Sequence, residues 1–148
     1  MPKSAPNIRE IEEIGEGILS ATLPKERWTH AAHCLATIYL IKARPVMDLP
    51  TEMPSIIRRY NEAVGTANSD TGGYHETLTQ FYLMAIRGYL AHKAEALTLE
   101  AASAMVLASP IGQRDFPLTY YSQDRLFSLE ARRGWVEPDL RPLDVYAL

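Results

Sequence analysis

The chain of 148 residues is 47% hydrophobic and 22% charged, and its formal net charge is -3 at pH 7. This length suits one domain with a single buried core, and the composition excludes an intrinsically disordered or fibrous protein. The weakly acidic charge argues against nucleic acid as a partner, because nucleic-acid binding requires a basic face.

The sequence lacks the features expected of a secreted or membrane-spanning protein. The N-terminal residues do not contain the apolar core of a signal peptide, and the longest apolar runs are much shorter than a membrane span. Cys34 is the only cysteine, so no internal disulfide is possible and a reducing compartment is expected. We therefore expect a cytoplasmic protein with no membrane partner.

The first predicted helix follows a short arm. Two prolines in residues 1–6 predict a flexible segment, and residues 7–148 are expected to form a single helical domain. Asn7 is a suitable N-cap for a helix from Ile8 to about Ser20. Isoleucines recur along this helix at three- and four-residue spacings and glutamates lie on the other face, which is typical of an amphipathic surface helix with a solvated acidic side.

The second predicted helix runs from His30 to about Ala43, with Thr29 as its N-cap. It is apolar on almost all sides, which predicts that it is buried. Apart from a lysine near its end, its polar residues are His30, His33 and Thr37. Their i, i+3, i+7 spacing places them in one narrow polar stripe.

Three more main helices are predicted. The third runs from Glu52 to about Val64, with Thr51 as its N-cap and Pro54 tolerated in the first turn. The fourth runs from Tyr74 to about Lys93 after a polar, glycine-containing loop, and it is the second helix apolar enough to be buried. The fifth runs from Leu99 to Ala108.

The C-terminal part is predicted to form short helices and an extended tail. No segment shows the alternation of a strand. We therefore predict an all-α, single-domain bundle of about five main helices. The short helices are expected at Phe116–Tyr121, Gln123–Phe127 and Leu129–Arg133, and the extended tail at residues 135–142.

Three segments carry recognisable patterns: W-T-H-x-x-H at residues 28–33, G-Y-H-E-T at 73–77 and W-V-E-P-D-L at 135–140. Together they resemble a family of small bacterial all-helical proteins that is functionally uncharacterised. Residues 59–61, Arg-Tyr-Asn, fit the same pattern, so the resemblance covers most of the chain from Leu23 onward. It implies one helical domain and supplies no reaction.

The histidines indicate where a site would form. His30, His33 and His75 lie in the first turns of the two helices predicted to be buried. If these two helices run parallel, with the third helix returning between them, the three histidines meet at one end of the bundle. This shared end is the candidate site.

The leading hypothesis for this site is a single divalent metal ion. His30 and His33 share a helix face, His75 is a third candidate ligand, and Glu76 offers a carboxylate. Three histidines suit zinc, and two histidines with a carboxylate suit non-haem iron. The positive partial charge of two helix N-termini opposes a cation. The sequence does not decide whether the protein is an enzyme.

Two other interpretations stay open. Converging helix N-termini favour an anionic or small-molecule ligand, for which Tyr74, Thr79, Tyr60 and Asn61 are the candidate binding residues. Alternatively, the residues have only structural roles: His75 and Glu76 cap their own helix, and His30 and His33 link helices through hydrogen bonds, which buried histidines need in any case. The proline-containing tail is expected to strap across the bundle or across a partner subunit, which makes a homodimer possible.

Overall fold

The structure is a computed structural model that describes residues 6–148, and this part of the chain is helical without any strand. The predicted all-α fold class is confirmed. The predicted flexible arm is residues 1–6, of which 1–5 lie outside the described residues. The main helices are α1 (Ile8–Leu19), α2 (His30–Ala43), α3 (Leu49–Ala63), α4 (Glu76–Tyr89) and α5 (Leu99–Ala108).

Shorter elements complete the chain and match the predicted short helices. A π-helical segment continues α4, and single 3-10 turns connect several helices. These elements are the π segment Leu90–Ala94, the 3-10 turns Lys25–Arg27, Pro110–Gly112, Phe116–Thr119 and Val145–Ala147, and the short helices α6 (Gln123–Leu126) and α7 (Leu129–Arg133).

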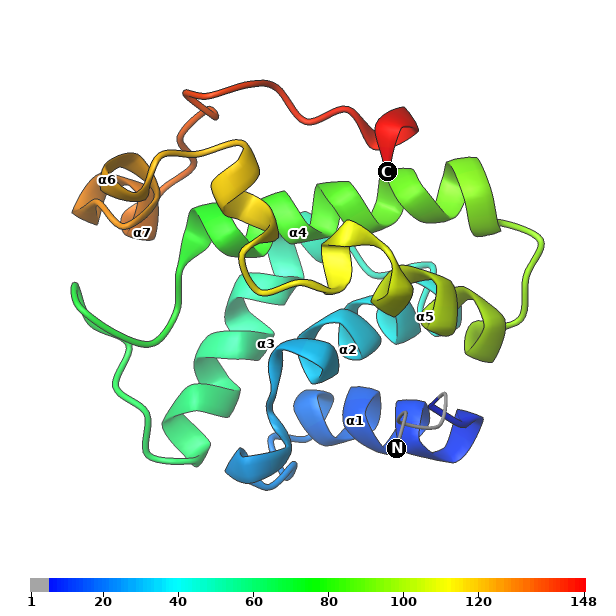
Figure 1. Ribbon diagram of the computed structural model, residues 1–148. Helices are drawn as coiled ribbons and strands as arrows, with labels where there is room; N and C mark the ends of the chain where they lie inside the picture. Colours follow the sequence, from blue (N-terminus) through cyan, green and yellow to red (C-terminus); the bar gives the residue numbers. More distant parts are fainter. Residues whose placement is uncertain (1–5) are drawn as a thin grey trace.

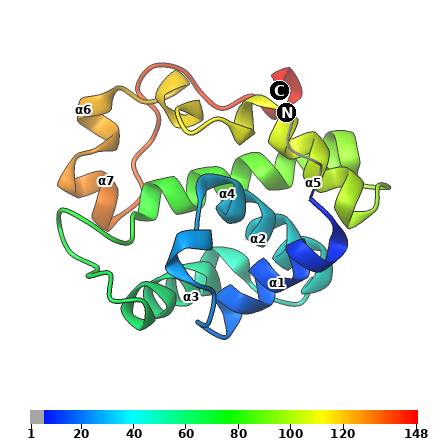
Figure 2. The ribbon, with the colours of Figure 1, turned by 60° about the horizontal axis from the view of Figure 1, so that its bottom comes forward.

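Helix α2 lies at the centre of the bundle, in contact with α1, α4 and α5. In Figure 1, α2 lies between α1 and α4, and both α2 and α4 run from left to right; Figure 2 shows the same common direction from another side. Helix α3 packs against α1 and α4 and returns the chain to the side on which α2 begins. The two buried helices therefore start at the same end of the molecule.

The position of α2 explains its composition. It contributes Cys34 and Ile38 to one group of buried side chains, and Leu35 and Leu40 to a second group under α1 and α3. A helix that is buried on opposite sides has to be apolar nearly all round. Partly buried side chains contact both groups and join them into one core: Ile41, Leu99 and Leu107.

Helix α3 begins at Leu49, three residues before the predicted start. The Asp48 N–H donates to the carboxylate of Glu52 at 2.6 Å. A glutamate in the first turn thus reaches back to the helix start, as in a capping box, and the predicted N-cap Thr51 is instead inside the helix.

The earlier start places Pro54 within α3. Proline has no N–H, so the carbonyl of Pro50 loses its usual partner four residues later. The side chain of Gln80 in α4 donates to this carbonyl at 2.9 Å. The proline therefore creates an acceptor that joins α3 to α4.

The C-terminal tail crosses the bundle of its own chain. The Tyr121 hydroxyl donates to the carbonyl of Val136 at 2.7 Å, and the N–H of Leu140 donates to the carbonyl of Tyr120 at 2.9 Å. The 3-10 turn that contains Val145 contacts α4. The tail thus straps across the bundle, as predicted, and the homodimer stays a prediction.

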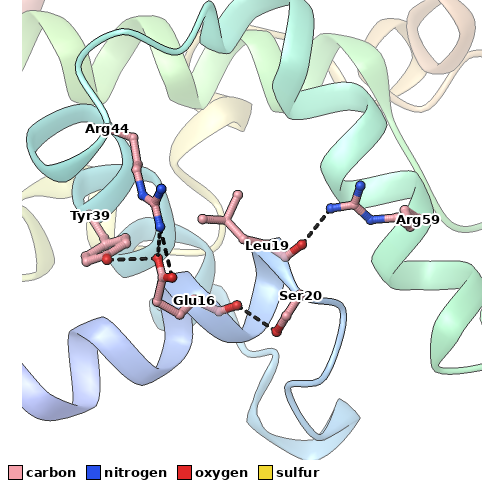
Figure 3. A network of polar contacts seen from close by, with 6 residues as sticks. All are labelled: Glu16, Leu19, Ser20, Tyr39, Arg44 and Arg59. Atoms are coloured by element: carbon pink, nitrogen blue, oxygen red, sulfur yellow. Dashed lines mark hydrogen bonds and ion pairs between the residues drawn. The ribbon is translucent and has the colours of Figure 1, made fainter.

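A polar network joins the end of α1 to α2 and α3 (Figure 3). Arg44 donates to both carboxylate oxygens of Glu16, at 2.9 and 2.8 Å, and the Tyr39 hydroxyl donates to the same carboxylate at 2.9 Å. Arg59 donates to the carbonyl of Leu19 at 2.6 Å. The acidic side of α1 is therefore not only a solvated face, because Glu16 also links two helices.

We expect the contribution of Glu16 to stability to depend on pH. Hydrogen bonds from Arg44, and then from Tyr39, lower the pKa of Glu16. A carboxyl whose folded-state pKa lies below its unfolded value stabilises the fold above the unfolded pKa, and this contribution is lost as the pH falls through the folded pKa. Glu16→Gln should lower the melting temperature slightly at pH 7, because the pair is exposed, and not at all in acid.

Glu12→Gln is the matched control, since Glu12 is exposed on the same helix. Its melting temperature should equal that of the wild type at every pH. A loss in Glu16→Gln that has the same size at pH 7 and in acid would contradict the ionic origin of the effect.

Candidate functional site

A cavity of about 530 Å³ lies between the N-terminal halves of α2 and α4, with α3 forming another wall. This volume falls within the range of about 300–1,000 Å³ that is typical of small-molecule sites. Most of the lining is apolar or aromatic, with Trp28, Tyr60, Tyr74 and Tyr82 as its largest side chains.

The structure brings most of the predicted site residues to this cavity. The exception is Glu76, whose carboxylate accepts hydrogen bonds from the hydroxyl of Tyr74 and, at 3.5 Å, from Gln80. The predicted residues that line the cavity are His30, His33, Tyr60, Asn61, Tyr74, His75 and Thr79.

His75 is the N-cap of α4. Its Nδ1 accepts a hydrogen bond from the N–H of Leu78 at 3.1 Å, and its Nε2 lies 2.7 Å from the carbonyl oxygen of Leu126. An accepting Nδ1 places the ring proton on Nε2, which then donates to Leu126. Both nitrogens are thus occupied, and α4 begins at Glu76 rather than at the predicted Tyr74.

His30 is also held by the protein. Its Nε2 lies 3.1 Å from the carbonyl oxygen of Ile111, and its ring centroid is 5.1 Å from that of Tyr82. The Sγ of Cys34 is 3.7 Å from the same nitrogen. Burial raises the pKa of the Cys34 thiol to about 12, so this cysteine is not a thiolate nucleophile at neutral pH.

His33 is different from the other two cavity histidines. Its ring packs against Trp28, with centroids 3.8 Å apart, and neither of its ring nitrogens has a hydrogen-bond partner within residues 6–148. Desolvation, together with the neighbouring His30, lowers the pKa of His33 to about 3. By accessible surface the residue is nevertheless exposed, and it lines the open cavity. It is a neutral imidazole with free hydrogen-bonding groups.

The other predicted binding residues serve mainly to build the walls. The Tyr60 hydroxyl donates to the carbonyl of Leu23 at 2.9 Å, and the Thr79 hydroxyl donates to that of His75 at 2.9 Å. The amide of Asn61 donates to Oδ1 of Asn68 at 2.9 Å. Both hydroxyl donors and one of the two amide donors of Asn61 are therefore engaged within the protein.

The sequence-based site did not include Trp28 and Tyr82. Tyr82 lies three residues after Thr79 and seven after His75, so helical periodicity places it on the same side of α4. Trp28 precedes the N-cap of α2 and contacts both His33 and, with ring centroids 5.4 Å apart, Tyr60. Its place in the W-T-H-x-x-H segment was the only signal for it.

The predicted metal ligands are not arranged as a metal site in this structure. Residues 6–148 contain no group of three or more His, Cys, Asp or Glu side chains placed to hold a metal ion. Both nitrogens of His75 are engaged, and Glu76 does not line the cavity. A zinc or iron site built from His30, His33, His75 and Glu76 stays a prediction.

No protein-family model, curated protein or solved structure matches this chain. Among the helices of residues 6–148, none combines the length and the apolar character needed to cross a membrane. The cavity and its polar groups are therefore the basis for assigning a function.

Proposed function

We propose that the protein binds a small organic molecule in the cavity between α2 and α4, and that the imidazole of His33 is its main polar contact. The observation that carries this proposal is an unpartnered imidazole in the wall of a cavity of about 530 Å³. His33 is exposed and lines the cavity, so both of its ring nitrogens are available to a ligand that displaces water there.

The chemistry of the walls fits such a ligand. A neutral imidazole offers one donor and one acceptor. Trp28 and Tyr82 supply large, stiff aromatic surfaces that bind rings with little loss of side-chain entropy. With its lowered pKa, His33 is a weak base at neutral pH, so the arrangement supports binding rather than proton transfer.

The proposal is tested by an NMR screen of isotopically labelled protein with a library of aromatic fragments at millimolar concentration. Hits should shift the signals of the His33 ring and of Thr37 and Thr79, which line the cavity. His33→Phe should weaken the hits roughly five- to tenfold, by the loss of one hydrogen bond, and should leave stability unchanged. A library without cavity hits, or a strongly destabilised His33→Phe, would overturn the proposal.

Two further measurements separate the alternatives. His92→Phe is the matched control, because His92 lies on the π-helical segment after α4 and does not line the cavity. It should leave fragment binding intact. Metal analysis of the purified protein, with zinc and ferrous iron titrated into the same NMR sample, tests the metal hypothesis. Stoichiometric metal that shifts His30 and His33 together would replace the proposed function.

A further inference from the structure

Within residues 6–148, the cavity is lined by positively charged residues but by no negatively charged ones. Its charged residues are Lys25, in the 3-10 turn before α2, and Arg114, which follows the turn at residues 110–112. None of the described lining residues is an aspartate or a glutamate. The acidic residues next to them in sequence, Glu26 and Asp115, are not part of the lining. Their charges still reach it: after burial, Glu26 raises the pKa of Tyr60, and Asp115 raises the pKa of Tyr82 more than Arg114 lowers it.

Neither cation is neutralised by an ion pair. The salt bridges among residues 6–148 involve Arg27, Arg44 and Arg133, and do not involve Lys25 or Arg114. Arg27 is a useful comparison, because it lies two residues from Lys25, is bound to Glu13 at 3.4 Å and does not line the cavity. Lys25 and Arg114 are therefore free to pair with an anionic group in the cavity.

Two histidines and two tyrosines of the lining add no charge to that of the two cations at pH 7. Burial lowers the pKa of His33 and of His75, so both imidazoles are neutral at pH 7, and burial raises the pKa of Tyr74 and of Tyr82, so both phenols stay protonated. A cationic ligand would find no carboxylate in the lining. A ligand with a negative group would meet two exposed, unpaired cations.

We infer that the ligand of this cavity is an organic acid, with an apolar ring-sized body against Trp28 and Tyr82 and a carboxylate directed toward Lys25 or Arg114. This inference rests on the proposed function. The charged residues of the lining, Lys25 and Arg114, are positive, whereas the whole chain has a net charge of -3. Either lining cation can pair directly with a carboxylate, whereas none of the described lining residues has a carboxylate to pair with a cationic ligand.

Three probes of matched shape test the inference: 2-naphthoate, the neutral 2-naphthamide and the cationic 2-naphthylmethylamine. Calorimetric titration at pH 7 should rank the affinities in that order, with the anion on the order of fivefold tighter than the amide, because each exposed cation contributes modestly. Added sodium chloride should remove this preference by screening the charges.

Variants identify the cations responsible. Lys25→Gln and Arg114→Gln should each reduce the preference for 2-naphthoate over 2-naphthamide about two- to threefold, and the double variant should abolish it. Both residues are exposed, so the variants should fold normally. Arg27→Gln is the control and should leave the preference unchanged.

The possible failures are distinguishable. If 2-naphthamide binds as tightly as 2-naphthoate, or if the double variant keeps the preference, the organic-acid inference is wrong and the proposed function stands. If none of the three probes binds and the fragment screen gives no cavity hit, both are wrong. Equal loss of the preference in Arg27→Gln would show that general surface charge, rather than the lining, attracts the anion.

Discussion

Replacing His75 with alanine is expected to lower the free energy of unfolding by about 2–5 kcal/mol. Loss of an N-cap costs about 1–2 kcal/mol, and a carbonyl left without a partner in a buried position costs about 1–3 kcal/mol. Both losses apply, because His75 is only 7% exposed and bonds both to Leu78 and to the buried Leu126. In a chain of this size the melting temperature should fall by roughly 5–15 °C.

Two isosteric variants separate these contributions. Asparagine can reproduce the acceptor at Nδ1 that caps α4, but it is too short to reach the carbonyl of Leu126. Glutamine can reproduce the donor at Nε2, but not the cap. His75→Asn and His75→Gln should therefore each recover part of the loss of His75→Ala. If His75→Ala is no less stable than His33→Phe in urea unfolding, the structural role of His75 is wrong.

The same histidine should make stability fall in mild acid. Burial lowers the pKa of His75 below its usual value of 6.5. The stabilisation is fully present above the unfolded pKa and is lost as the pH falls through the folded pKa, because a protonated Nδ1 cannot accept from Leu78. Subtracting the unfolding free energies of His75→Ala from those of the wild type at each pH should reveal this loss, and a pH-independent difference would contradict it.

Most helix starts could be predicted because their signals are local. Asn7, Thr29, Thr98, Ser122 and Ser128 each accept a hydrogen bond from the backbone N–H three residues later. A short polar side chain before an apolar periodic run is sufficient evidence for such a cap. The fold class followed from these starts and from the absence of strand alternation.

The two wrong starts depended on less common or distant partners. At α3, the carboxylate of Glu52 accepts a hydrogen bond from the backbone N–H of Asp48. The carbonyl of Pro50, which has no N–H partner at Pro54, accepts instead from Gln80, 30 residues away. At α4, the capping group is the imidazole of His75, which the sequence offered only as an alternative because histidine is not among the preferred N-cap residues. Propensity rules do not contain these contacts.

The location of the candidate site could be predicted from the sequence, but the hydrogen-bonding roles of its histidines could not. Helix order alone indicated that α2 and α4 start at one end, and both helices do line one cavity there. The roles of the histidines depend on carbonyl groups far along the chain: Leu126 is 51 residues from His75, and Ile111 is 81 residues from His30. Which imidazole remains unpartnered is therefore a property of the tertiary structure.

The segment just before α4, which forms part of the cavity wall, depends on a single glycine. Gly73 has φ of +78°, and a Cβ at this position would collide with the carbonyl oxygen of Ala67 and lie 2.8 Å from Cα of Asn68. Asn68 holds this wall together, since its Oδ1 accepts from the amide of Asn61 at 2.9 Å and from the N–H of Tyr74 at 3.0 Å. A side chain at residue 73 therefore pushes directly against the support of Tyr74.

Gly73→Ala is expected to cost at least about 1–2 kcal/mol from the left-handed backbone alone, with a further cost from the collision. The adjacent Gly72→Ala is the matched control, because the nearest atom to its Cβ would be Oγ of Ser69 at 4.0 Å, and it should change stability by less than about 0.5 kcal/mol. Urea unfolding measures both variants.

Gly73→Ala should also weaken 2-naphthamide binding, since displacement of Asn68 moves Tyr74 in the cavity wall. Equal stability of the two variants would contradict the strained turn, and loss of stability with full probe affinity would show that this turn supports the fold without shaping the cavity.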